Sequence, residues 1–178
     1  MHRKTSRQEG FTLVELMVTI VVFGILLMIA VPSFTSMMDT VRVKRAGDAV
    51  NAFMVNAKSE AIKRNATVRA IVQVADSGAT WCVGMTTAAS CDCLTAGSCQ
   101  IDGADRIISN SAYKSVSLDG PDDAHAFVFS ALRGTVSGNE TVELVSGNDV
   151  KLNVVVAPTG RVRLCSPDGS AGGYATCP

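Results

Sequence analysis

This chain of 178 residues has little of what most enzymes and nucleic-acid-binding domains need. It has two histidines, one tryptophan and 5% aromatic residues, and its 16 basic residues balance 16 acidic ones. A nucleic-acid-binding domain is usually basic, so any anion binding must come from a local patch. No serine lies in a nucleophile-elbow pattern, and His125 stands at the head of an apolar segment, where a structural or surface role is expected. The sequence therefore predicts neither an enzyme nor a cofactor.

Charge is also absent from one long stretch near the N-terminus. After Glu15 no charged residue occurs before Asp39, and nearly every position from Leu16 to Val31 is apolar. About 20 apolar residues of helix cross a bilayer core. Taken alone, the run could be a signal peptide, a membrane anchor or a buried helix, but no small-residue cleavage site follows it and helix-like sequence continues through Pro32. Basic residues precede the run, which places the C-terminus outside the cytoplasm by the positive-inside rule.

Glu15 is the unusual residue of this segment. A carboxylate at membrane depth costs about 2.5–3.5 kcal/mol on insertion scales, so it needs a partner or a proton. The apolar run itself contains no cation. A cut after Gly10 would create an amino group at Phe11, and in a bundle of such helices Glu15 of one copy could face Phe11 of another.

The stretch Gly10-Phe11-Thr12-Leu13-Val14-Glu15 and the basic leader before it resemble the class III signal of type IV pilins and type II secretion pseudopilins. The resemblance implies that a prepilin peptidase cuts between Gly10 and Phe11, that the new N-terminus at Phe11 is methylated, and that Glu15 guides assembly. Pro32 matches the helix-kinking proline of the family. Residues 1–10 would then be a cleaved leader, and the mature chain would keep 13 basic and 15 acidic residues.

Beyond the apolar run, apolar residues recur every three or four positions, which predicts one buried stripe on an amphipathic helix. The stripe consists of Val43, Ala46, Val50, Phe53, Met54, Ala57 and Ala61. We expect one helix over 11–65, with 11–35 in the membrane or the pilus core and Asn65 as the C-cap. Residues 66–178 form the expected disulfide-bonded β domain. The expected fold is α+β and pilin-like, a long N-terminal helix packed on an antiparallel β-sheet domain.

Short β-rich segments separated by turn signals predict the strands of this domain. The expected strands are Thr67–Val74, Trp81–Met85, Tyr113–Leu118, Ala126–Ser130, Thr141–Val145, Val150–Ala157 and Arg161–Cys165, and Ala104–Ser111 is ambiguous. Ser146-Gly147-Asn148-Asp149 predicts a hairpin turn. Trp81 is expected in the core or over the disulfide region, with a stacking surface as the alternative.

Six cysteines follow the helix: Cys82, Cys91, Cys93, Cys99, Cys165 and Cys177. An even number in an exported domain predicts disulfides. A zinc site built from the middle four is the alternative, but their spacing lacks the paired C-x-x-C of common zinc sites, so we expect no metal. Proximity favours Cys165–Cys177, and the working assignment of the others is Cys82–Cys91 and Cys93–Cys99.

Further stretches resemble the GspH/FimT branch, which holds the minor pilins FimU and FimT and the pseudopilin GspH. They are the helix end Asn56–Arg64, the β-rich Val68–Val74, Trp81 and the closing Pro158-Thr159-Gly160-Arg161-Val162-Arg163-Leu164-Cys165. FimT-like competence pilins carry a Gly-Arg-x-Arg motif that contacts DNA. Gly160, Arg161 and Arg163 match this motif.

Arg161 and Arg163 lie two residues apart on an expected strand, so both guanidiniums would point to solvent while Val162 and Leu164 point to the core. Two exposed arginines could hold adjacent phosphates. Lys151 and the amides of the tail glycines could add to such a DNA-binding patch. The alternatives are a solvated strand face or a contact between subunits.

The resemblance implies a minor type IV pilin, a structural subunit of a priming or tip complex needed for pilus assembly and twitching motility. Its partners would be other minor pilins, the major pilin and the prepilin peptidase. It would lie in the inner membrane with a periplasmic C-terminus before assembly, and in the cell-surface pilus afterwards. Two alternatives stay open, namely a pilin that binds DNA for uptake in natural transformation and a GspH-like minor pseudopilin of type II secretion.

Overall fold

The computed structural model describes residues 10–119, 124–138 and 140–177, with the backbone alone at 30–33, and the expected leader positions 1–9 lie outside this range. Contacts within the chain divide it into two units, Met1–Met37 and Met38–Pro178. Helix α1 (Leu13–Arg64) contributes to both units.

The first unit is the N-terminal part of α1. Thr12 Oγ1 accepts a hydrogen bond of 3.2 Å from the backbone N–H of Glu15, which caps the start of the helix. The large apolar side chains described between Leu13 and Ile29 are 45–81% exposed. As expected, the helix continues through Pro32. Over an 18-residue window its mean hydropathy is 2.8, so by length and composition it could cross a membrane.

In the second unit, α1 buries one stripe of side chains, as the apolar spacing predicts. Val43, Ala46, Val50, Met54, Ala57 and Ala61 are fully buried, and Phe53 is partly buried against them. Gly47 lies on the sheet-facing side of α1, and a Cβ there would stand 2.4 Å from Leu152 Cδ2, so its missing side chain allows close packing. Asn65 follows the helix in the left-handed region, with φ 49°, and is the expected C-cap.

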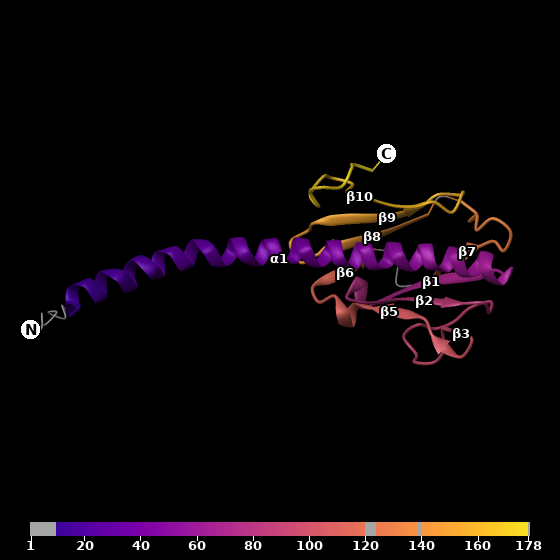
Figure 1. Ribbon diagram of the computed structural model, residues 1–178, viewed down its shortest axis with the longest axis horizontal. Coiled ribbons are helices and arrows are strands. Elements are labelled where there is room, and N and C mark those ends of the chain that lie inside the picture. The colour runs from indigo at the N-terminus through magenta and orange to yellow at the C-terminus, as the bar shows by residue number, and fades with distance from the viewer. Residues whose placement is uncertain (1–9, 120–123, 139, 178) are drawn as a thin grey trace, which may run out of the picture. The chain divides into compact units, whose positions relative to one another are not determined.

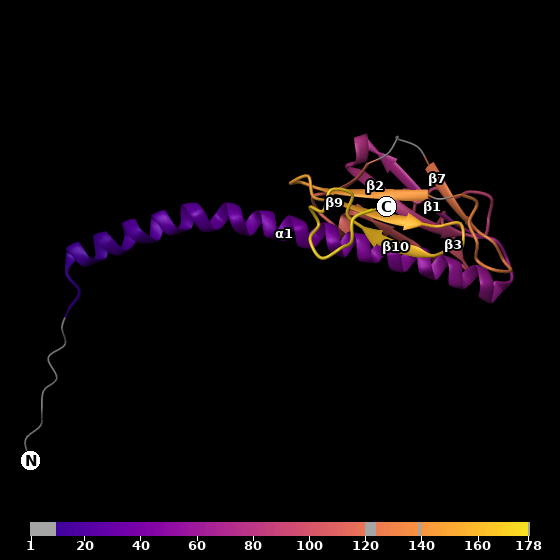
Figure 2. The same cartoon turned by 90° about the horizontal axis from the view of Figure 1, so that it is seen from above.

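Two antiparallel four-stranded sheets surround this core, and α1 lies along one side of both (Figures 1 and 2). The first sheet has the order β5-β2-β1-β7, with β1 Val68–Ala75, β2 Thr80–Thr86, β5 Ile107–Ser109 and β7 Ala124–Phe129. The second has the order β10-β9-β8-β6, with β6 Val116–Asp119, β8 Glu140–Ser146, β9 Lys151–Val156 and β10 Val162–Cys165. A separate hairpin pairs β3 (Gln100–Ile101) with β4 (Ala104–Asp105).

The expected α+β fold is confirmed, and each expected strand has a counterpart. The hairpin joining β8 to β9 is also confirmed, with Val145 opposite Lys151. The ambiguous segment 104–111 divides into β4, β5 and the short 3₁₀ turn Asn110–Ala112. The division into two sheets was not predicted, because it depends on pairing between distant segments. Strand β3 was not predicted, because it is only two residues long.

Trp81 joins the two sheets inside the core. Its side chain is fully buried, its Nε1 donates a 2.9 Å hydrogen bond to Val116 O, and its ring stacks on Tyr113 with centroids 6.0 Å apart. The core expectation is therefore confirmed, and the buried ring offers no stacking surface. His125 is exposed and contacts Glu140 across the sheets, which agrees with a surface role.

All six cysteines form disulfides, and Cys165 pairs with Cys177 as expected. The assignments Cys82–Cys91 and Cys93–Cys99 are wrong, because the structure pairs Cys82 with Cys93 and Cys91 with Cys99. The segment after β2 folds back over the outer face of β1 and β2, where Gln73 Oε1 accepts a 2.5 Å hydrogen bond from Cys93 N.

Gly84 leaves room for this folded-back segment. A Cβ at Gly84 would stand 2.4 Å from Cys99 Sγ and 2.8 Å from Cys93 Cβ. Proximity in the chain could not foresee the pairing, because it depends on which cysteine reaches the sheet surface.

Candidate functional site

The expected processing and assembly residues lie where α1 begins. Gly10 precedes the helix, is exposed, and has no atom within 4 Å of the place that a Cβ would take. Phe11 is 80% exposed. Glu15 lies in the first turn of α1, where the helix dipole favours a carboxylate. Within the part of the chain that the structure describes, no ion pair involves Glu15.

The Gly-Arg-x-Arg motif lies at the start of β10, an edge strand of the second sheet. Arg161 and Arg163 are exposed, whereas Val162 and Leu164 pack against the core. The two arginines therefore share the solvent side of the strand, which is the geometry expected from their spacing. Among residues 10–119, 124–138 and 140–177, neither guanidinium has an ion-pair partner.

Gly160 is needed for the turn that leads into this strand. Its φ is +70°, and a Cβ there would stand 1.9 Å from the carbonyl oxygen of Gly134. The turn is closed by a 2.8 Å hydrogen bond from Gly160 N to Ala157 O. On α1, Lys58 Nζ donates to Thr159 O at 3.3 Å and to Gly160 O at 3.0 Å. Helix, turn and strand are thereby held together.

A second loop, residues 130–136, lies against this turn although it comes from a distant part of the chain. Val136 N donates a 3.0 Å hydrogen bond to Pro158 O, and Gly134 packs against Gly160. Arg133 precedes Gly134 in the chain and is exposed. Sequence reasoning missed both Lys58 and Arg133, and no spacing rule could have found them, because Lys58 is 102 positions away from Gly160.

Lys151 does not join the two arginines. Its Nζ lies 3.1 Å from Glu143 Oε1, and this hydrogen bond raises the pKa of Lys151, with smaller contributions from Asp119 and Asp168. Arg163 pairs with Val155, which lies four residues along β9 from Lys151, or about 13 Å at the usual rise of a strand.

The tail glycines also lie elsewhere. Gly172 O accepts a 2.6 Å hydrogen bond from Lys44 Nζ, and Tyr174 OH donates to Asp48 Oδ1 at 3.3 Å. Lys44 is fourteen residues from Lys58 on α1, or about 21 Å. The tail therefore packs near a different part of the helix from the motif.

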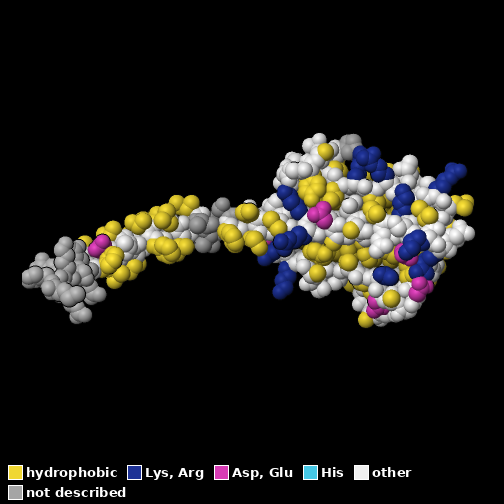
Figure 3. Space-filling view, viewed as in Figure 1, with side chains coloured by type: hydrophobic (Ala, Val, Ile, Leu, Met, Phe, Trp, Pro, Cys, Tyr) yellow, Lys and Arg dark blue, Asp and Glu magenta, His cyan; other side chains and the backbone are white. Residues whose placement is uncertain are grey.

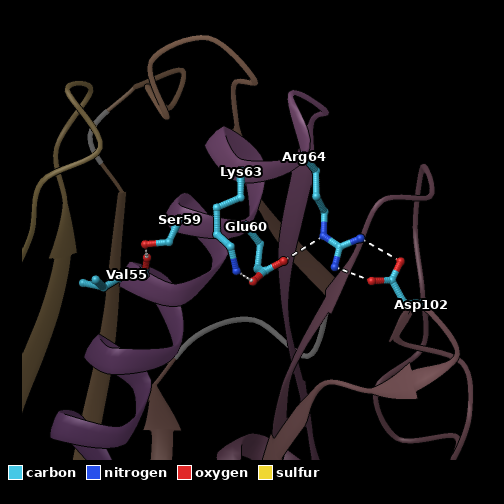
Figure 4. A network of polar contacts seen from close by, with 6 residues as sticks. All are labelled: Val55, Ser59, Glu60, Lys63, Arg64 and Asp102. Atoms are coloured by element: carbon cyan, nitrogen blue, oxygen red, sulfur yellow. Dashed lines mark hydrogen bonds and ion pairs between the residues drawn. The ribbon is translucent and has the colours of Figure 1, made fainter.

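A polar network joins the end of α1 to the β3–β4 hairpin (Figure 4). Arg64 Nε donates to Glu60 Oε2 at 2.7 Å, while its two terminal nitrogens donate to Asp102 at 2.7 and 2.5 Å. Hydrogen bonding to Arg64 lowers the pKa of Asp102, and Arg64 with Lys63 lowers the pKa of Glu60. These charges compensate one another, so the network holds the hairpin in place and offers no open site.

The surface charge agrees with the near-neutral composition. In the face shown in Figure 3, lysine and arginine side chains are spread around the second unit and interspersed with carboxylates. No single large basic field is visible on this face, so binding of an anionic polymer would depend on a few residues.

The chain is similar to two solved structures, the type IV minor pilin FimU of Pseudomonas aeruginosa and the minor pseudopilin EpsH of the Vibrio cholerae type 2 secretion system. For FimU the identity is 19%, the match covers 68% of this chain and 87% of FimU, and the TM-score is 0.48. For EpsH the corresponding values are 16%, 71%, 98% and 0.49.

Two family models match the chain. The prokaryotic N-terminal methylation motif matches residues 5–31, which include Gly10, Phe11 and Glu15. The type II transport protein GspH matches residues 46–160, more than half of the chain. The chain therefore belongs to the GspH family and is a minor pilin or pseudopilin of the GspH/FimT kind, a structural subunit and not an enzyme.

Proposed function

We propose that the chain is a minor pilin of a type IV pilus, built into a priming or tip complex through the first part of α1. The exposed apolar side chains from Leu13 to Ile29 carry this proposal. Burying one such side chain is worth about 1.5–3 kcal/mol, so the segment needs a membrane or a bundle of similar helices around it. Within the described residues, these side chains are left exposed.

The proposal assigns a place to each part of the chain. Residues 1–10 are a leader removed by a prepilin peptidase, and residues 11–35 lie in the inner membrane before assembly and in the pilus core afterwards. The β domain is periplasmic first and on the cell surface later. Glu15 pairs with the amino group of Phe11 on a neighbouring subunit, because a low-dielectric bundle strengthens the attraction between opposite charges.

Processing is tested on protein extracted from the membrane. Mass spectrometry should find a chain that begins with N-methylated Phe11. Gly10→Val should block the cut, while Gly24→Val, at a glycine inside α1 that likewise has nothing within 4 Å of its Cβ position, should be cut normally. A mature protein that keeps Gly10 would contradict the pilin proposal.

Assembly is tested by the amount of the subunit in sheared pili. Glu15→Ala should lower incorporation and leave the β domain folded, since Glu15 is far along the chain from the core, whereas Glu15→Asp keeps the charge and should retain part of it. Normal incorporation of the alanine variant would contradict the proposed pairing. Deleting the gene should reduce surface pili and twitching motility. Loss of protein secretion with normal pili would instead identify a type II pseudopilin.

DNA binding is a second candidate function, supported by the exposure of Arg161 and Arg163 on one side of an edge strand. Because the mature chain is near neutral, we expect weak binding that does not depend on sequence and is easily lost with salt. The full chain in a non-ionic detergent should bind labelled duplex DNA at low salt. The double variant Arg161→Gln, Arg163→Gln should abolish binding, and binding that persists in it would contradict this function.

A further inference from the structure

We propose that Arg133 is the third arginine of a phosphate-binding surface with Arg161 and Arg163, and that Lys58 positions this surface without contacting phosphate. The ligand is the phosphodiester backbone of duplex DNA, so the inference rests on the second candidate function above. Arg133 lies outside the Gly-Arg-x-Arg motif, and only the fold brings it there.

The first argument is the contact between two loops. The carbonyl oxygen of Gly134 stands 1.9 Å from where a Cβ of Gly160 would be, and Val136 N bonds to Pro158 O at 3.0 Å. Arg133 and Arg161 are the neighbours of the two touching glycines. With 3.8 Å between consecutive Cα atoms, their backbones are on the order of 10 Å apart. Duplex DNA carries one charge per about 1.7 Å of its axis, so one short stretch of backbone can reach both arginines.

The second argument is that Arg133 extends from an ordered loop. Ser130 N donates to Thr135 O at 2.9 Å, Gly134 N donates to Ser130 O at 2.9 Å, and the hydroxyls of Ser130 and Thr135 lie 2.9 Å apart. A loop already ordered in the free protein loses little entropy when it binds.

The third argument is that the guanidiniums of Arg133, Arg161 and Arg163 form no ion pair with the described residues. Arg42 is paired with Asp39, and Arg64 with Glu60 and Asp102. In the described part of the chain, Arg133 has no ion pair and is exposed, like Arg161 and Arg163. Such arginines are free to exchange water for phosphate oxygens.

Lys58 has a different role because its ammonium is already bound. Nζ donates to the carbonyl oxygens of Thr159 and Gly160, and its stem lies under the second loop, with Cγ 2.6 Å from the Cβ position of Gly134. Lys58 therefore touches both loops that carry the arginines. It is a positioning residue for the surface.

The test is a titration of labelled duplex DNA with the full chain in a non-ionic detergent, repeated at several salt concentrations. Three phosphate contacts predict a slope of about −2.7 for log K against log salt, and Arg133→Gln should change it to about −1.8. At 50 mM salt the variant should bind roughly tenfold more weakly. The matched control Arg45→Gln removes another exposed arginine, on α1, and should leave both values unchanged.

Lys58→Met keeps the stem and removes the ammonium. It should weaken binding and keep the slope near the wild-type value, because no phosphate contact is removed. A slope that becomes less negative by about one unit, as for Arg133→Gln, would mean that Lys58 contacts phosphate directly. That result would overturn its positioning role.

The outcomes separate this inference from the function on which it rests. If the wild-type chain does not bind DNA, both fail. If Arg161→Gln, Arg163→Gln abolishes binding while Arg133→Gln binds like the wild type, DNA binding stands and the inference alone is wrong. Thermal unfolding of each variant shows that the change acts on binding and not on folding.

Discussion

Replacing Gly160 by alanine tests how tightly the two loops and α1 are joined. The new Cβ would stand 1.9 Å from the carbonyl oxygen of Gly134, which is a backbone atom and cannot rotate away. Relief requires the loops to separate, which breaks the hydrogen bond from Val136 N to Pro158 O and disturbs those of Lys58 Nζ.

The expected loss of stability has two parts. A non-glycine residue at φ +70° costs about 1–2 kcal/mol, because its Cβ crowds the following carbonyl. Losing one backbone hydrogen bond and weakening those of a charged group adds about 2–3 kcal/mol. We therefore expect Gly160→Ala to destabilise the second unit by about 3–5 kcal/mol.

Gly169→Ala is the matched control. Gly169 has φ +75°, but nothing lies within 4 Å of its Cβ position, so only the conformational cost of about 1–2 kcal/mol applies. The difference between the two variants isolates the contact between the loops.

Urea unfolding with the disulfides intact measures both variants. Trp81 is the only tryptophan and is fully buried between the sheets, so its fluorescence reports loss of the core. Equal free energies of unfolding for Gly160→Ala and Gly169→Ala would refute the close contact. The arrangement of Arg133 beside Arg161 would then lose its main support.

Three further predictions concern the disulfides of the β domain and the Arg64–Asp102 ion pair. Replacing Cys165 and Cys177 by serine should cost about 3 kcal/mol in the chain-entropy model, measured by urea unfolding, and an unchanged midpoint would contradict a stabilising role. Gly84→Ala should hinder formation of the two disulfides above it and expose reactive thiols, whereas the intact wild-type chain should label none. The pKa of Asp102 is lowered in the folded chain, mainly by Arg64, so its stabilisation should be present above pH ~4 and fade as the pH falls through the lower folded value. Asp102→Asn should slightly lower the thermal midpoint at pH 7 and converge with the wild type in acid, and a constant difference would contradict this reasoning.

Much of the fold follows from short-range patterns. The buried stripe from Val43 to Ala61 was predicted because helical spacing places residues three and four apart on one face. The strands were predicted because alternating and β-branched segments end at turn signals, as at the hairpin after Ser146. Strand order was not predicted, because the two sheets pair segments such as β1 and β7 that lie far apart in the chain.

For the proposed phosphate-binding surface, too, only the features that depend on local spacing were predicted. The shared orientation of Arg161 and Arg163 was predicted from their spacing on a strand. The separation of Lys151 was not predicted, because Glu143 on the neighbouring strand binds it, and that pairing depends on the sheet register. Arg133 and Lys58 carried no signal of their own.

The sequence by itself determined the properties that depend on neighbours within a few positions: the uncharged apolar run, the N-terminal methylation motif, the lone carboxylate of Glu15 and the amphipathic helix. Only the tertiary structure decided how the four cysteines from Cys82 to Cys99 pair, and that Lys58 and Gly134 converge on Gly160. Periodicity acts over one or two turns of helix or a few residues of strand. A disulfide or a contact between loops instead depends on where the whole chain returns, which no local pattern encodes.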